Sequence, residues 1–146
     1  MKLKDCFEKE LLRKVKIHEE VAVKEINNAY RHLENANRCM NEKIYDLAIV
    51  SVYTGMFHAA ISLLFQDSIK ERSHLCIIEY LKDKYPDLEG YVPILDNYRR
   101  SRHTMLHWID VELLSEDAEE GIISATKFID KIEKKLKSAQ TQEEGR

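Results

Sequence analysis

The chain has 146 residues, four glycines, two prolines and a formal net charge of -3 at pH 7. With 44% hydrophobic and 34% charged residues, it fits one soluble domain with a substantial core, which excludes a disordered tail or a disulfide scaffold. The scarcity of glycine and proline predicts an all-α fold. Because the net charge is slightly negative, the whole chain does not attract nucleic acid or anionic membranes, and any RNA contact requires a local basic patch.

The three cysteines, Cys6, Cys39 and Cys76, are widely spaced and odd in number, and the sequence has no Cys-x-x-Cys pair. This pattern predicts reduced, mostly buried thiols rather than a zinc site or a redox motif. The first residues are basic but lack a following apolar stretch and a small-residue cleavage site, so we expect no secretory signal. Together these features predict a cytoplasmic protein.

Apolar residues recur at helical spacing from Leu12 to Met40, which predicts one long helix over residues 5–41. The pattern allows a break in this helix between Arg13 and His18. Residues 41–43 are polar, and they predict a short turn before the next helix.

A second helix is predicted from Tyr45 to about Ser68. Residues 47–65 contain no Asp, Glu, Lys or Arg, and their number approaches that of a membrane-spanning helix. However, polar side chains such as Thr54 and His58 interrupt the run, and no cluster of Lys or Arg marks a cytoplasmic flank. We therefore expect the central helix of a bundle rather than a membrane span, apolar nearly all round because neighbouring helices surround it.

Three further helices are predicted in the second half of the chain. Ser73 can cap the first of them, which ends before Pro86 because a residue preceding proline avoids helical dihedral angles. Pro93 suits the first turn of the next helix. Ser115, followed by several acidic residues, marks the start of the last helix, where negative charge favours the positive end of the helix dipole.

A dense run of arginine and histidine, residues 99–107, lies on the predicted helix that has Pro93 in its first turn. At about 100° per residue, Arg99, His103 and His107 share one helix face. Arg102 instead projects from the apolar side of the helix. A charge in that position requires a carboxylate, a phosphate or an interface.

Other interpretations of these residues stay open. Arg102 could pair with Asp46 or another carboxylate inside the bundle, as buried charges often do. His103 and His107 also have the i, i+4 spacing of metal ligands, and Asp110 projects to the same side. Because the glutamate of a His-Glu-x-x-His motif is absent, we expect no metal.

Two histidines outside this run have structural interpretations. His58 lies within the central helix and is expected to be a hydrogen-bonded core histidine rather than a catalyst. His74 lies in the first turn of its helix, where a local structural role is expected. Thiol catalysis is not expected, because no cysteine lies in an evident basic setting.

Three segments carry a resemblance to a known family. Residues 45–48 lead into residues 51–60, which fit the pattern A-x-x-x-x-Y-x-x-M-F-x-A-A when counted from Ala48. Residues 72–74 (Arg-Ser-His) follow, and then Arg102 is followed at the fifth position by a histidine. In this order and spacing the chain resembles the HEPN domain, named for its occurrence in eukaryotic and prokaryotic nucleotide-binding contexts.

The sequence itself predicts about five helices in a single domain over residues 1–140, with a frayed tail at 141–146. The resemblance, which spans about residues 14–136, implies that these helices form an up-and-down bundle. HEPN domains often dimerise, and many are metal-independent endoribonucleases, some of them toxins paired with a small nucleotidyltransferase antitoxin. Their signature is Arg-x-x-x-x-His, often with Asn after the Arg. By position, Arg102 and His107 are the catalytic residues, and His103 stands where Asn is frequent.

The chain departs from the family pattern at two positions. The first is His103, and the second is Ile109, two positions after the histidine of the motif, where some members have a tyrosine that the antitoxin adenylylates. That mode of silencing is therefore not expected here.

RNA cleavage needs a proton acceptor, a proton donor and a cation at the phosphorane, and no cofactor. His107 would be the general base or acid, Arg102 would stabilise the transition state, and Arg99 or His103 would position the RNA backbone. A homodimer would bring two copies of Arg102 and His107 into a shared cleft. The alternative is a non-catalytic HEPN module that binds its partner or a nucleotide.

Overall fold

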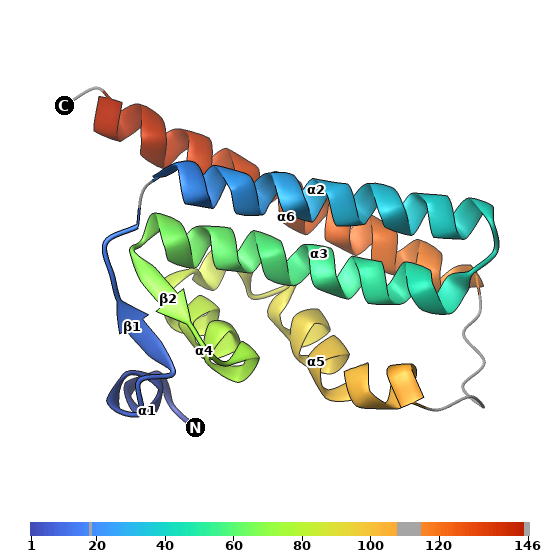
Figure 1. Cartoon of the computed structure of the whole chain (residues 1–146), viewed down its shortest axis with the longest axis horizontal. Coiled ribbons are helices and arrows are strands. Elements are labelled where there is room, and N and C mark those ends of the chain that lie inside the picture. The colour runs from blue at the N-terminus through green and yellow to red at the C-terminus, as the bar shows by residue number, and fades with distance from the viewer. Residues whose placement is uncertain (18, 108–114, 145–146) are drawn as a thin grey trace.

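The computed structural model describes the backbone of residues 1–17, 19–107 and 115–144, and the side chains of residues 1–17, 19–100 and 115–141. It confirms the all-α prediction, with one small two-stranded sheet added (Figure 1). In the described part of the chain the elements are α1 (Leu3–Glu8), β1 (Leu12–Lys14), α2 (Glu19–Asn41), α3 (Tyr45–Gln66), β2 (Ile69–Glu71), α4 (His74–Lys84), the short 3-10 helix η1 (Pro86–Leu88), α5 (Val92–His107) and α6 (Ser115–Glu144).

Helices α2, α3 and α6 run along the long axis of the molecule and pack on one another, and α4 and α5 lie against α3 (Figure 1). The turn between α2 and α3 is short, so the two helices are antiparallel. Helix α6 runs in the same direction as α3, since Ala118 packs near Ala48 and Ile129 lies beside Gly55. Helix α5 returns towards the start of α6.

The central position of α3 explains its composition, because neighbours surround it on several sides. Side chains around most of its circumference are buried, including those of Val52, Met56 and Leu63. By length and composition α3 could also cross a membrane, but 67% of its apolar window is buried inside the protein. The prediction of a central bundle helix is confirmed.

Helix packing around α3 is close at two glycines. A Cβ atom on Gly55 would meet the backbone carbonyl oxygen of Ala29 on α2 at 3.1 Å. A Cβ atom on Gly121 of α6 would meet the hydroxyl oxygen of Tyr98 on α5 at 2.8 Å. Both contacts lie below ordinary van der Waals separation. The contact at Gly55 is with a backbone atom, so α2 can approach α3 this closely only where the side chain is absent, whereas the contact at Gly121 is with the end of a side chain.

The prediction of a single helix over residues 5–41 is wrong for the first third of that range. Helix α1 ends at Glu8, Glu10 adopts a positive φ of 57°, and β1 then pairs antiparallel with β2. Further backbone hydrogen bonds extend this ribbon, from Arg72 N–H to Leu11 O and from Val15 N–H to Ser68 O. The interruption between Glu8 and Glu19 includes the allowed break but begins earlier, and it contains the strand β1.

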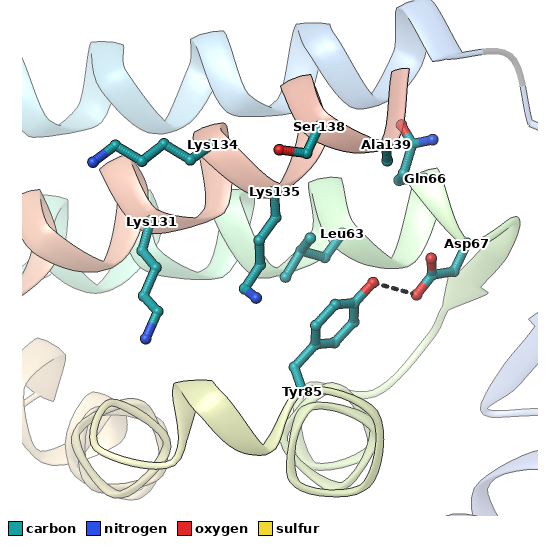
Figure 2. Close-up of a pocket in the computed structure, with 9 residues that line it drawn as sticks. All are labelled: Leu63, Gln66, Asp67, Tyr85, Lys131, Lys134, Lys135, Ser138 and Ala139. Carbon is teal, nitrogen blue, oxygen red and sulfur yellow. Dashed lines mark hydrogen bonds between the residues drawn. The ribbon is translucent and has the colours of Figure 1, made fainter. Parts of the chain in front are cut away.

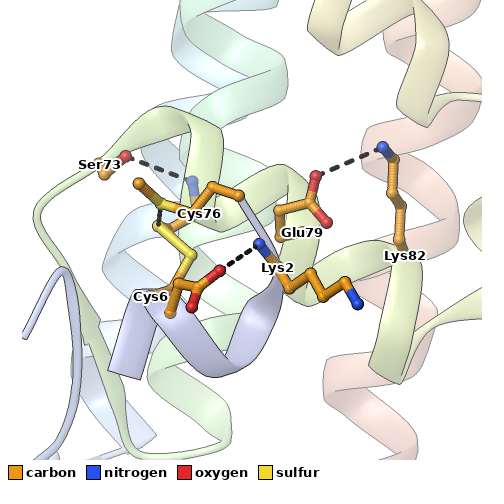
Figure 3. The surroundings of a disulfide bond; sticks show 8 residues. Lys2, Cys6, Ser73, Cys76, Glu79 and Lys82 are labelled. Carbon is orange, nitrogen blue, oxygen red and sulfur yellow. Dashed lines mark hydrogen bonds and ion pairs between the residues drawn. A yellow bond between two sulfur atoms is a disulfide. The ribbon is translucent and has the colours of Figure 1, made fainter. Parts of the chain in front are cut away.

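The prediction of reduced thiols is also wrong for two of the three cysteines. Cys6 on α1 and Cys76 on α4 form a disulfide bond, and both are fully buried (Figure 3). Cys39 is a free, half-buried thiol. The sequence could not show this pairing, because 70 residues separate the two cysteines and only the fold brings them together. The cytoplasmic location rested partly on reduced thiols, and a reducing compartment disfavours such a bond, so the location stays a prediction.

The later helix starts agree with the sequence. The Ser73 hydroxyl accepts a hydrogen bond from the Cys76 N–H at 3.3 Å, which confirms the predicted cap (Figure 3). Helix α4 ends at Lys84, before Pro86 as predicted, and α6 begins at Ser115. Helix α6 extends to Glu144, while the domain limit at residue 140 stays a prediction.

Candidate functional site

Helix α5 carries the predicted catalytic segment, and its first half is firmly packed. Pro93 lies in its first turn, where the missing N–H has no helical partner to lose. Leu95 is fully buried and Val92 nearly so, which fixes this half against the core. The Tyr98 ring packs edge-on against the ring of Tyr53 on α3, with 6.4 Å between the ring centres.

The first two arginines of the segment share one carboxylate. Arg99 binds Asp96 through both Nη2 at 2.9 Å and Nε at 3.0 Å, and Arg100 Nε lies 3.4 Å from the other oxygen of Asp96. Arg99, predicted to contact RNA phosphate, is therefore held by a neighbouring residue on its own helix. Its side chain keeps 28% of its surface exposed, so a phosphate could still reach it.

The other predicted site residues cannot be placed as side chains. Arg102, His103 and His107 belong to α5, but their side chains lie outside the described residues, and Asp110 does so entirely. Which groups these side chains contact, how exposed they are and whether they act in catalysis stay predictions. The ion pair between Arg102 and Asp46 also stays a prediction. In the described residues no group of three or more His, Cys, Asp or Glu side chains is arranged to hold a metal ion.

A groove of about 650 Å³ lies between α5 and the start of α6. Its α5 wall combines apolar side chains with Arg100, and its α6 wall is acidic, with Asp117 and Glu120. Burial, with Asp117 and Glu120 nearby, raises the pKa of Tyr98 above its ordinary value, so its hydroxyl stays protonated at neutral pH.

The segments that carry the family resemblance meet beside α5. His74, at the start of α4, lies with its Nδ1 2.8 Å from the Tyr53 hydroxyl, and its ring stacks on Phe57 with 4.4 Å between centres. Tyr53 in turn contacts Tyr98. The residue motifs at 51–60 and 72–74 therefore join α3, α4 and α5, in agreement with the structural role expected for His74.

His58 belongs to a polar cluster that sequence reasoning missed in part. Its Nδ1 lies 2.5 Å from Glu25 Oε2 on α2, and its ring stacks on His32 with centres 5.1 Å apart. His58 is hydrogen-bonded as expected, but 29% of its side chain is exposed, so it lies at the surface rather than in the core. Glu25 and His32 lie seven residues apart on α2, a spacing that places them on one face.

Comparison with known proteins assigns this arrangement of helices to a family. The sequence pattern of the HEPN domain matches residues 22–136, which cover most of the chain and include α5. The chain belongs to the HEPN domain family. It is also similar to a Methanocaldococcus jannaschii protein named "Putative toxin MJ0142", with 28% identity over 116 residues that cover 76% of this chain and 78% of that protein.

Proposed function

We propose that the chain is a metal-independent endoribonuclease, the toxin of a module whose antitoxin is a small nucleotidyltransferase. The observation that carries this proposal is the Arg-x-x-x-x-His spacing of Arg102 and His107 within the region that matches the HEPN family. The similarity to a protein named as a toxin supports the same role.

The chemistry of the proposed site follows from these two side chains. RNA supplies its own nucleophile, the 2′-hydroxyl, so the protein must remove that proton, stabilise the phosphorane and protonate the leaving oxygen. His107 titrates near neutrality and can transfer the protons. Arg102 stays charged and can bind two phosphate oxygens in the transition state.

The decisive experiment incubates the purified protein with RNA in EDTA. We expect cleavage to continue in the chelator. Both Arg102→Ala and His107→Ala should lower the cleavage rate by about 100-fold or more, a typical loss when a group that stabilises the transition state is removed. Circular dichroism and thermal melting confirm that each variant is folded.

An exposed lysine on the ribbon provides a matched control, because Lys70→Gln removes a charge from β2, away from α5. This variant should cleave RNA at the rate of the wild type. Full cleavage by either the Arg102 or the His107 variant would overturn the assignment, and so would complete inhibition by EDTA.

A non-catalytic HEPN module is the second candidate. It is favoured by the engagement of Arg99 and Arg100 with Asp96, which leaves less positive charge on α5 for RNA. Co-purification with a nucleotidyltransferase encoded beside it, together with no RNA cleavage by the wild type, would support this candidate over the ribonuclease.

A further inference from the structure

A second open groove, which shares no lining residue with the groove between α5 and α6, lies between the second half of α6 and the junction of α4 with η1 (Figure 2). Its volume is about 500 Å³, within the range of small-molecule sites. It is lined by Leu63, Gln66, Asp67, Tyr85, Lys131, Lys134, Lys135, Ser138 and Ala139.

One end of the groove is cationic. Lys131 and Lys135 extend from α6 towards η1 (Figure 2). Both reach Asp87, which lies on η1. Lys135 forms an ion pair with the Asp87 carboxylate, and Lys131 donates a 2.8 Å hydrogen bond to the Asp87 backbone oxygen. The hydrogen bond from Lys135 lowers the pKa of Asp87 below its ordinary value. Lys134 also lines the groove, but its side chain points away from Lys131 and Lys135 (Figure 2).

The acidic residues of α6 do not neutralise these lysines, because they are turned to other partners. Asp130 accepts a 2.6 Å hydrogen bond from the Tyr30 hydroxyl on α2, and Glu133 pairs with Lys137 at 3.5 Å. The excess of positive charge therefore stays in the groove. A single carboxylate is shared by two ammonium groups there, an arrangement that a dianion would satisfy more completely.

The opposite end of the groove offers a hydrogen-bond acceptor, the carboxylate of Asp67. The Tyr85 hydroxyl donates to Oδ2 of Asp67 at 2.7 Å (Figure 2). The Tyr80 hydroxyl donates to the same oxygen at 2.8 Å. Burial and the hydrogen bond to Asp67 raise the pKa of both tyrosines above their ordinary value, so both remain donors at neutral pH. Asp67 is exposed and keeps its second carboxylate oxygen, which can accept from a ligand hydroxyl or amino group.

We propose that this groove binds a small phosphate monoester that also carries hydroxyl or amino groups. The phosphate replaces Asp87 at Lys131 and Lys135, and the hydroxyl or amino group donates to Asp67. Leu63 and Ala139 supply the apolar floor between the two ends. Asp87 is an internal competitor for the phosphate, and its half-exposed side chain on a short 3-10 turn can rotate away.

A small ligand fits these charges better than RNA. An extended polyanion would meet Asp67 in the groove after leaving the lysines, and the carboxylate would repel its next phosphate. The proposed site therefore differs from the α5 site in its ligand as well as in its position.

Binding is measured by isothermal titration at low salt, with ribose 5-phosphate, inorganic phosphate and ribose as probes. Ribose 5-phosphate should bind about tenfold or more tightly than inorganic phosphate, because it contacts both ends of the groove, and ribose should not bind. Lys135→Gln and Lys131→Gln should each weaken ribose 5-phosphate binding about tenfold, whereas Lys70→Gln on β2 should not change it.

Two acidic variants distinguish the ends of the groove. Asp87→Asn should strengthen the binding of both phosphate probes, because the internal competitor loses its charge. Asp67→Asn should remove the advantage of ribose 5-phosphate while leaving inorganic phosphate unchanged. These outcomes do not depend on ribonuclease activity, which the Lys135 variant should retain if the α5 site cleaves RNA.

Three results would overturn the proposal. One is equal affinity for ribose 5-phosphate and inorganic phosphate, and another is unchanged binding in both lysine variants. The third is an RNA oligonucleotide that binds in a Lys135-dependent manner while ribose 5-phosphate does not bind, which would make the groove an RNA contact.

Discussion

At the scale of single residues, Gly55 shows how little space separates α2 from α3. The atom that a Cβ would approach is a backbone carbonyl oxygen, which cannot turn aside as a side chain can. We expect Gly55→Leu to lower the free energy of unfolding by about 2–3 kcal/mol through overpacking. Urea denaturation monitored by circular dichroism measures the change.

Gly90 provides the matched control for this substitution, because a Cβ atom there would meet nothing within 4 Å and its φ is not positive. Gly90→Leu should change the free energy of unfolding by less than about 0.5 kcal/mol, as is usual for surface substitutions. Equal effects of the two substitutions would show that α2 and α3 are not in close contact at Gly55.

His32 should make the stability of the protein depend on pH. Burial, His58 and Arg31 together lower the pKa of His32 from its ordinary 6.5. The unfolded chain therefore takes up this proton at a higher pH than the folded chain, so acidification favours unfolding. We expect the free energy of unfolding to fall as the pH drops through 6.5.

The substitution His32→Gln isolates this contribution, because it keeps a polar side chain without the titration. Urea midpoints at pH 7.5, 6.5 and 5.5 should decline less in the variant than in the wild type. Glu71, whose pKa burial raises, contributes with the opposite sign in both proteins and cancels in the comparison. Parallel pH profiles for the two proteins would contradict the prediction.

At the scale of elements, the disulfide holds α1 against α4. Closing a loop of about 70 residues should stabilise the folded chain by about 4 kcal/mol, mainly by restricting the unfolded state. Cys6→Ser should therefore lower the melting temperature strongly, and a thiol reductant should lower that of the wild type to a similar value. Differential scanning calorimetry provides the measurement.

Cys39→Ser is the control for the loss of a thiol, because Cys39 takes no part in the bond. Its melting temperature should stay near that of the wild type. Without reductant, alkylation followed by mass spectrometry should modify Cys39 but neither Cys6 nor Cys76. Alkylation of all three cysteines in the native protein would show that the bond is absent.

The elements that the sequence predicted are those with local signals. Helix α3 follows from an uncharged run, α4 from the Ser73 cap, and α6 from Ser115 with its acidic first turn. The ribbon was missed because β1 and β2 have only three residues each and are far apart in sequence. Their pairing is a tertiary contact, and three residues are too few to show a period of two.

The candidate site, too, could be predicted from local sequence signals but not where it depends on tertiary contacts. The Arg-x-x-x-x-His spacing and its position on one helix could be found in the sequence. The ion pair between Arg99 and Asp96 was not predicted, although the i, i+3 spacing of an acidic and a basic residue on one helix could have indicated it. The groove at Lys131 and Lys135 could not be foreseen, because Asp67 and Asp87 reach it from other elements.

At the scale of the whole molecule, one domain supplies few catalytic groups, and the proposed ribonuclease is expected to work as a homodimer. Sedimentation velocity should give twice the mass of one chain at micromolar concentration. If two copies of Arg102 and His107 share one cleft, the cleavage rate per chain should also fall on dilution below the dissociation constant. A monomer with undiminished activity would contradict this expectation.

The match to the HEPN family begins at residue 22, so α1 and β1 precede the shared domain and are attached to it covalently through Cys6 and Cys76. A protease that cuts once after the exposed Lys16 would therefore sever the backbone without releasing the first 16 residues. The nicked protein would keep all its residues and gain the mass of one water, and the leading peptide would separate from the remainder only after a thiol was added.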